Sequence, residues 1–424
     1  MSGRMSRALI GGCFALIIVI WAARRPDQFS HPYAWVEESF IFDTWQKGGF
    51  LDAAFTPVQG YLVLPSSVSV SAILSLSFLD FPILAYIVAL GWFLVLPALW
   101  LFPGSRLPLE MRLALAVAPV LVPTGPEVFG VLLYSIWWVT LWPVAVLFWD
   151  SPKWALRIPV LLLAGLSGLA GGALFFVFAV QWALRRKVED AVSAAVLFAT
   201  LIPQLIIYSG SERSGTLKPS VADVIEQAFA NIGKYPLVWF ESADQYYLAF
   251  IGFVVAGALL YIGWYAWNRN RAYFITFAAF LLVLGVFTVL SAIPAPGIAA
   301  PTNWAGNRYF FLPFTAITWL AIVLIFSPWR KLAALGGVAV LLGLFSLIPS
   351  FQAPLAGEKP DWEGELIAAC TEPGGPGEVP FHFDGRTADA WQLALTEDTC
   401  EKVFEATGTS AAPTASVSSG DRNP

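Results

Sequence analysis

Charged side chains are scarce in this 424-residue chain. Lysine, arginine, aspartate and glutamate make up 12% of the residues, whereas 58% are hydrophobic and the mean hydropathy is +0.69. A soluble domain carries about 25% charged residues, so this chain has too little polar surface to cover a water-facing fold. The composition excludes a soluble globule and predicts a protein that crosses the membrane many times.

Several signatures of catalysis and nucleotide binding are missing as well. The two histidines, His31 and His382, are too few for a histidine-based zinc cluster. There is no Walker-type phosphate loop and no Gly-x-Ser-x-Gly elbow. An enzyme with this sequence must therefore take its energy from an already activated substrate, and no nucleic-acid partner is expected.

Cysteine is rare, with three residues in the chain. Cys13 falls in the first apolar run, whereas Cys370 and Cys400 both fall in the C-terminal tail. In an oxidising compartment the tail pair could form a disulfide, although their spacing leaves a pair of free thiols equally open.

Long apolar runs of about 18 to 25 residues separate the few charges, and each could cross a hydrocarbon core of about 30 Å as a helix. Nineteen tryptophans and 33 phenylalanines are typical of aromatic rings at both interfaces. The sequence predicts an all-α integral membrane protein with about eleven transmembrane helices. The predicted crossings are 8–23, 82–102, 112–125, 130–149, 157–168, 172–184, 191–208, 246–267, 272–292, 309–326 and 332–349.

Basic residues set the expected orientation. The first run follows Arg4 and Arg7 and is interpreted as a retained signal anchor with a cytoplasmic N-terminus, although the pair Arg24 and Arg25 argues against it. Counting forward, five basic clusters fall on the cytoplasmic side, as the positive-inside rule expects. These clusters are Arg106 with Arg112, Lys153 with Arg157, Arg185 to Lys187, Arg269 with Arg271, and Arg330 with Lys331.

The segment 60–78 separates two interpretations of the topology. In the preferred one it lies on the outer surface without spanning, because six serines interrupt its apolar residues; a helix and a strand are both open there. A glycine-rich break at 168–172 is then an outer turn between half-length helices. In the alternative, 61–78 is a span and 158–182 is one helix, which also gives eleven crossings but moves two basic clusters outside.

The preferred topology divides the chain into a membrane domain and a tail. Residues 1–350 form the polytopic domain, and its first extracytoplasmic loop carries interfacial helices. Residues 351–407 form a small extracytoplasmic tail, and residues 408–424, rich in Ser, Ala, Thr and Gly, are expected to be disordered. The outer loops are predicted at about 24–81, 209–245 and 293–308.

Two adjacent carboxylates, Glu37 and Glu38, stand at the head of an aromatic, apolar segment in the first outer loop. In partly desolvated surroundings, burial and like-charge repulsion raise the proton affinity of such a pair, as a general base acting on a hydroxyl requires. The pair could instead hold a divalent cation. It could also be a solvated first turn of a helix.

Three further polar positions lie at predicted outer ends of spans. Glu127 stands at a tight Gly-Pro turn near the bilayer, where a carboxylate without a partner is costly. Arg308 opens the tenth predicted span, and its guanidinium suits bidentate phosphate binding. Arg213, in the second outer loop, could also meet a phosphate. The plainer interpretations are a solvated turn, a snorkelling helix anchor and a solvent-facing loop residue.

Four short motifs follow one another along about residues 1 to 350. They are Trp35-Val-Glu37-Glu38-Ser-Phe-Ile-Phe, Gly60-Tyr61-Leu62, Pro126-Glu127-Val128 before Trp138, and Asn307-Arg308-Tyr309-Phe-Phe-Leu-Pro313. This ordered set resembles the GT-C superfamily of membrane glycosyltransferases, which includes protein mannosyltransferases and bacterial lipid-A or polysaccharide sugar transferases. The resemblance implies a polyprenyl-phosphate-sugar donor, a saccharide or protein acceptor, and an active site on the extracytoplasmic side of a bacterial-type plasma membrane.

The resemblance also implies roles for the acidic residues. Glu37 or Glu38 would deprotonate or orient the acceptor hydroxyl in an inverting single displacement. Because the pair is Glu-Glu rather than the more usual Asp-containing pair, the catalytic carboxylate is not identified. A divalent cation, Mg²⁺ or Mn²⁺, would be held by Glu38 or Glu127 if the reaction needs one.

Substrate-binding roles follow from the same resemblance. Arg308 with Tyr309 would hold the donor phosphate, and Arg213 is a further candidate for it. Glu127 and Trp138 would help to close the pocket. A different class of function stays open at this stage: a transporter, flippase or polymerase-type protein that handles lipid-linked saccharides, or an inactive scaffold with the same fold.

Overall fold

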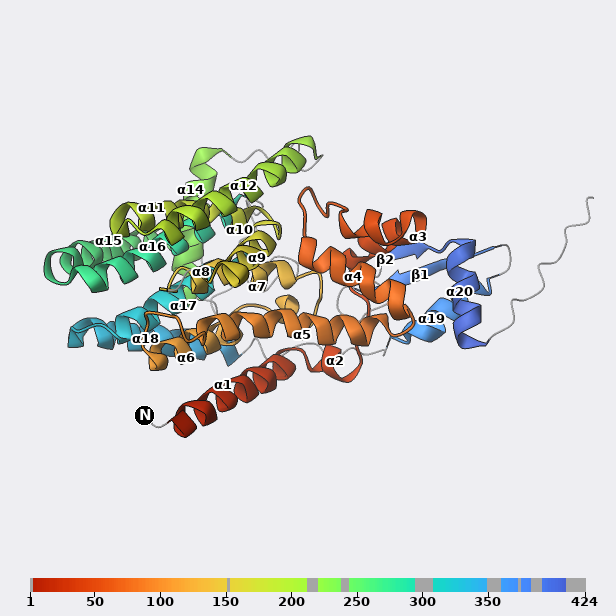
Figure 1. Cartoon of the computed structure of the whole chain (residues 1–424), viewed down its shortest axis with the longest axis horizontal. Helices are drawn as coiled ribbons and strands as arrows, with labels where there is room; N and C mark the ends of the chain where they lie inside the picture. The colour runs from red at the N-terminus through yellow and green to blue at the C-terminus, as the bar shows by residue number, and fades with distance from the viewer. Residues whose placement is uncertain are drawn as a thin grey trace, which may run out of the picture.

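The computed structural model describes residues 3–150, 153–211, 220–237, 244–293, 308–348, 360–372, 375–382 and 391–408. Within them the chain is almost entirely helical, apart from one antiparallel sheet of β1 (Glu378–Phe381) and β2 (Trp391–Ala394). Figure 1 shows an elongated molecule with a bundle of long helices at one end. At the other end lies a cap, which comprises α2 (Pro26–Ser30), α3 (Ser39–Ala54), α4 (Leu64–Ser77), α19 (Trp362–Cys370), α20 (Glu397–Thr407) and the sheet.

Seven helices in the described part of the chain are long and apolar enough to cross a membrane. α17 is buried along most of its length and lies inside the bundle, whereas α1 is mostly exposed. A helix that is apolar all round suits both places, because lipid and protein interior are equally free of water. The seven are α1 (Gly3–Arg24), α5 (Phe81–Trp100), α12 (Val188–Gly210), α15 (Gln245–Arg269), α16 (Arg271–Ala292), α17 (Phe311–Ile325) and α18 (Arg330–Leu347).

The other four predicted crossings form shorter pieces, so eleven full crossings are not confirmed. Proline and glycine interrupt them: Pro119 and Pro143 begin new short helices, and Gly168 has a φ of +110° between two others. Short pieces are stable at membrane depth only where protein satisfies their backbone. They are α6 (Leu109–Val117), η2 (Ala118–Leu121), α7 (Ser135–Val139), α8 (Trp142–Val146), α9 (Trp154–Gly165), α10 (Leu169–Ala173) and α11 (Phe175–Arg185).

The segment 60–78 forms the 14-residue helix α4. Four of its six serines are buried: Ser66 is fully buried, and its hydroxyl lies 3.0 Å from the Leu133 carbonyl and 2.8 Å from the Ser135 hydroxyl. This inward contact explains why a serine-rich stretch is helical here. The prediction of the alternative topology that 158–182 is one helix is wrong, because the chain breaks between α9 and α10.

Basic residues gather at the end of the bundle away from the cap. Asp150 joins two of the clusters, since its carboxylate lies 3.0 Å from Arg185 and 2.9 Å from Lys187. Buried Arg157 donates to the Ser193 hydroxyl and to the Trp149 carbonyl at 3.0 and 3.2 Å. The described clusters therefore share one end, as the charge pattern predicts.

Arg24 and Arg25 are the exception, and the structure shows what they do at the cap end. Both are almost fully buried. Arg24 donates to backbone carbonyls of the segment 120–124, and Arg25 pairs with Asp27 at 2.8 Å. Their charges are satisfied inside the protein, so they do not report on orientation as exposed loop charges do.

The described residues of the tail form part of the cap, and a disulfide links two of its helices. A disulfide joins Cys370 at the end of α19 to Cys400 in α20, while Cys13 is free and buried in α1. The backbone of His382 exchanges hydrogen bonds with Ala34 and Val36, each 3.0 Å long. The tail thus supports the residues directly before Glu37. The predicted disorder of 408–424 falls almost wholly outside the described residues.

Candidate active site

Three residues that are distant in sequence meet where the bundle joins the cap. One terminal nitrogen of Arg308, Nη1, lies 2.5 Å from an oxygen of Glu127 and 3.1 Å from an oxygen of Glu37. Both carboxylates are buried, and the Arg308 side chain is 13% exposed. A guanidinium shared by two carboxylates in a water-poor site is a strong interaction, because charge-assisted hydrogen bonds gain strength there.

Tyr134 lies at the centre of this group. Its hydroxyl is 3.0 Å from both Glu37 oxygens and 3.0 Å from Glu127 Oε1, and it also contacts Arg308 Nη1. The phenol of a tyrosine keeps its proton at neutral pH. A protonated Tyr134 donates to one carboxylate and accepts from the guanidinium.

The local backbone explains why the side chains of Glu37 and Glu38 point in different directions. They occupy one 3₁₀ turn, η1 (Val36–Glu38), in which neighbouring side chains point about 120° apart. Glu37 faces Arg308 and accepts from the Trp35 indole, whereas Glu38 turns back into the protein. Glu38 accepts from the backbone nitrogens of Trp35 and Leu133 at 3.0 and 3.3 Å. Glu38 therefore ties the turn to the chain before Tyr134.

Burial shapes the protonation of both flanking acids. It raises the pKa of Glu38 to about 7, partly offset by its backbone hydrogen bonds. Burial also raises the pKa of Glu127, against the opposite influence of Arg308. Glu127 Oε2 is buried and has no hydrogen-bond partner in the structure. Both carboxyls therefore bind a proton more readily than in water, as acid–base groups in active sites often do.

The paired tryptophans of α7 also differ in role. Trp138 was predicted to close the pocket, but it lies in the core, with ring centroids 4.7 Å from Trp21 and 5.7 Å from Phe93. Its neighbour Trp137 reaches the site and meets Tyr309 edge-on at 5.9 Å. The helical turn of about 100° per residue sends the two rings to different sides. Arg213 lies outside the described residues.

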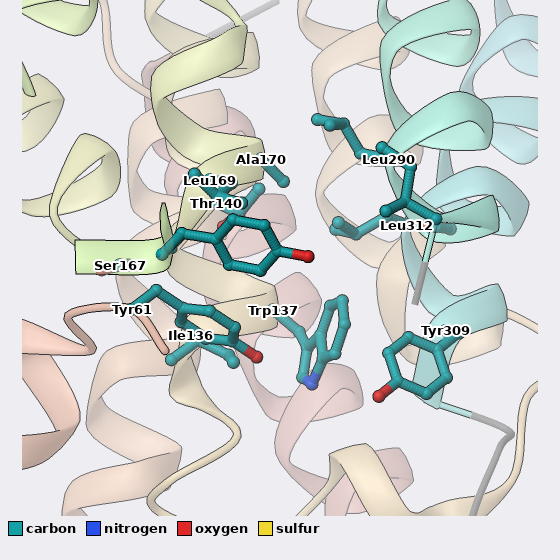
Figure 2. Close-up of a pocket in the computed structure, with 14 residues that line it drawn as sticks. Tyr61, Ile136, Trp137, Thr140, Ser167, Leu169, Ala170, Leu290, Tyr309 and Leu312 are labelled. Carbon is teal, nitrogen blue, oxygen red and sulfur yellow. The ribbon is translucent and has the colours of Figure 1, made fainter. Parts of the chain in front are cut away.

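Two adjoining cavities open at the site. The charged cavity, of about 340 Å³, is lined by Glu37, Tyr134 and Arg308 among others. The aromatic chamber, of about 700 Å³, extends from it between α7, α12, α16 and the start of α17, as Figure 2 shows in part. The residues that line both are Tyr61, Ile136, Trp137 and Tyr309.

The buried arginines of the cap end support this arrangement. Arg24 holds the chain that leads to Glu127 through the carbonyls of Val120 and Val122, at 3.2 and 2.9 Å. Arg25 bridges from Asp27 to the Tyr33 hydroxyl, 2.8 Å away, close to the start of η1. The segments that carry Glu37 and Glu127 are thereby fixed to the end of α1.

A divalent-cation site at Glu38 or Glu127 finds no support in the described residues. No group of three His, Cys, Asp or Glu side chains with ligand geometry occurs among them. Glu38 is engaged by backbone nitrogens, and the guanidinium of Arg308 lies where a cation between Glu37 and Glu127 would bind. The charge that opposes these carboxylates comes from Arg308.

Nothing in the sequence marks Tyr134 or Trp137 as a residue of the site. Both lie within a predicted crossing and carry no charge, so hydropathy gives no signal for them. Glu37, Glu127 and Arg308 were identifiable because ionisable groups near a bilayer are costly without partners. Comparison with protein-family models, curated proteins and solved structures finds no match to this chain.

Proposed function

We propose that this chain is a membrane glycosyltransferase. It moves a sugar from a polyprenyl-phosphate-linked donor to a hydroxyl of a saccharide or protein acceptor. The observation that carries the proposal is the meeting of Glu37, Glu127, Tyr134 and Arg308, from three separate segments, at the mouth of a cavity between apolar helices. Such a site offers a base, a phosphate-binding cation and room for a lipid-linked substrate.

Arg308 binds the donor phosphate in this proposal. In the structure its guanidinium is neutralised by Glu37 and Glu127. An incoming phosphate competes for the same donors and offers the bidentate geometry that arginine prefers. As the sugar–phosphate bond breaks, Arg308 stabilises the charge that develops on the departing phosphate, which is an electrostatic contribution to the rate.

Glu37 acts as the general base. When the phosphate draws Arg308 away, Glu37 loses its cationic partner and accepts a proton more readily. It takes the proton from the acceptor hydroxyl, whose oxygen attacks the anomeric carbon. The bond from that carbon to the phosphate oxygen breaks, and polyprenyl phosphate leaves with the electron pair. A single displacement of this kind inverts the anomeric configuration.

Glu127 and Tyr134 set the position of these two groups. Tyr134 keeps a hydrogen bond to the carboxylates while Arg308 changes partner, which holds Glu37 in place. Glu127, whose pKa is raised by burial, can take up a proton as Arg308 departs and so avoids a buried unpaired charge. Tyr309 lines the passage between the two cavities.

The cap faces the extracytoplasmic side in this proposal, with the basic end of the bundle in the cytoplasm of a bacterial-type cell. The positive-inside tendency supports this placement, because the basic clusters share the end away from the cap. The disulfide in the tail suits an oxidising compartment. Donor and acceptor would then meet where cell-envelope saccharides are assembled.

Purified protein with Arg308→Lys, Arg308→Ala or Glu37→Gln tests the proposal. Transfer of label from a pool of polyprenyl-phosphate sugars to envelope acceptors should fall at least about a hundredfold in Arg308→Ala and Glu37→Gln, and less in Arg308→Lys. Monodisperse elution in detergent controls for folding. Undiminished transfer in both Arg308→Ala and Glu37→Gln would remove these residues from the mechanism. Movement of the intact donor across vesicles without transfer would favour the flippase alternative.

A further inference from the structure

The aromatic chamber combines four aromatic rings with a neutral, hydroxyl-bearing wall. The rings belong to Tyr61, Trp137, Tyr208 and Tyr309. Thr140, Ser167 and Ser291 add hydroxyl groups, and none of the described residues that line the chamber carries an acidic or basic side chain. A wall of this kind suits a molecule with apolar faces and neutral polar edges.

Two hydrogen-bond donors on this wall have no partner. The Ser291 hydroxyl, near the end of α16, is buried and unpaired, and Ser291 is 3% exposed. The indole nitrogen of Trp137 is likewise buried and unpaired. Figure 2 shows this nitrogen between the hydroxyls of Tyr61 and Tyr309. These three residues line both cavities, so the indole nitrogen lies beside the place assigned to the phosphate.

The unpaired donors distinguish between two parts of the donor substrate. An isoprenoid tail in the chamber has no acceptor to offer and would leave both buried donors unpaired, which forgoes the free energy of two hydrogen bonds. The hydroxyls of a sugar would accept from both donors, while its apolar faces stack on the rings. A charged sugar would meet no opposite charge on the wall, and an uncompensated charge is costly to bury.

We propose that the aromatic chamber holds the transferred sugar, and that this sugar is a neutral hexose or pentose. Its hydroxyls accept hydrogen bonds from Trp137 and Ser291. This inference rests on the proposed glycosyltransferase function and gives it a substrate class. A site built to hydrogen-bond sugar hydroxyls discriminates strongly against ligands that lack them. The two residues are substrate-binding groups, and Glu37 and Arg308 keep the roles given above.

Binding of defined probes to the purified full chain tests the inference. The probes are farnesyl phosphate, its esters with mannose, glucose, galactose and arabinose, and its ester with glucuronic acid. At least one neutral ester should bind more tightly than farnesyl phosphate, and the glucuronic acid ester should not. Trp137→Phe and Ser291→Ala should each reduce that gain about three- to tenfold, the value of one hydrogen bond, and leave farnesyl phosphate binding unchanged.

Matched controls exist beside both residues. Trp138→Phe removes a buried, unpaired indole N–H that does not line the chamber. Thr288→Val removes a hydroxyl one turn earlier in α16 that is satisfied by the Leu284 carbonyl. Both controls should keep the full gain. Equal losses for farnesyl phosphate and the neutral ester in Trp137→Phe and Ser291→Ala would show that the chamber holds the tail, and would overturn the inference.

Failure of the inference differs from failure of the proposed function. If farnesyl phosphate binds and Arg308→Ala abolishes that binding, but no neutral sugar adds affinity, the inference alone is overturned. Equal binding of the glucuronic acid ester and the best neutral ester would also overturn it alone. If farnesyl phosphate does not bind, or binds equally well to Arg308→Ala, the phosphate site itself is wrong and both proposals fall.

Discussion

Glu37 and Glu38 have the same side chain and adjacent places in the sequence, yet they face different surroundings. Glu37 contacts Arg308 and Tyr134, whereas Glu38 accepts from two backbone nitrogens behind the site. The sequence indicates both carboxylates as candidates. It does not show which one faces Arg308, because that depends on the direction of one 3₁₀ turn. For a single residue, the sequence shows that burying its charge is costly. It does not show which way the side chain points.

Glu38 predicts a pH dependence of stability. Burial raises its pKa from an ordinary 4.5 to about 7. Between these values the folded protein holds a proton that the unfolded chain has released, so stability falls as the pH rises from about 4.5 to about 7 and stays lower above it. We expect a higher Tm in detergent at pH 5 than at pH 8, and a flatter profile in Glu38→Gln.

Thermal unfolding followed by intrinsic fluorescence measures this effect. Glu110→Gln, at an exposed position at the start of α6, is the matched control and should keep the wild-type profile. An unchanged slope in Glu38→Gln would show that this carboxyl is already ionised in the folded protein at pH 5.

At the scale of helices and segments, α17 and the tail each help to position residues of the site. α17 begins three residues after Arg308 and is buried along most of its length, so Arg308 is attached directly to a well-packed helix. The turn that carries Glu37 is short and depends on its neighbours, including the backbone of His382 in the tail. The tail is therefore part of what positions the base, although none of its described residues lines either cavity.

The disulfide of the tail gives a prediction at this scale. Replacing Cys370 and Cys400 together with serine removes a crosslink between residues 30 apart, which typically contributes about 2–4 kcal/mol. We expect faster proteolysis of the tail and slower sugar transfer, since Val36 and Ala34 lose a fixed partner strand. Limited proteolysis and initial rates measure the two effects.

The free cysteine supplies the control for this experiment. Cys13→Ala changes a buried thiol in α1 that forms no disulfide, and it should leave proteolysis and transfer near wild type. Wild-type transfer by a variant whose tail is readily cleaved would separate the tail from catalysis.

At the scale of the whole molecule, the distribution of charge and the shape both distinguish two ends. The cap gathers the first loop and the tail, while the described basic clusters share the opposite end (Figure 1). In the part of the chain that the structure describes, seven long apolar helices and several broken ones lie between them. Two of the short helices, α7 and α10, line the aromatic chamber, and irregular backbone is tolerated at membrane depth next to such a cavity.

Cysteine labelling tests the placement of the two ends. Asp52→Cys in α3 and Lys331→Cys in α18 occupy exposed positions in the cap and at the basic end. In a Cys13→Ala background, a membrane-impermeant maleimide should label Asp52→Cys in intact spheroplasts and Lys331→Cys only after permeabilisation. The reverse pattern would place Arg308 and Glu37 at the cytoplasmic face and contradict the proposed reaction.

The sequence by itself determined the membrane class, most helix positions and the sharing of one end by the basic residues, because these depend on sums of local transfer free energies. It also indicated Glu37, Glu127 and Arg308, since charges near a bilayer need partners. Only the tertiary structure decided that these three share one contact through Tyr134, that Trp137 rather than Trp138 lines the cavities, and that the crossings 112–125 and 130–149 are broken into short helices. Those outcomes depend on helix register and on packing between segments about a hundred or more residues apart, which no local pattern encodes.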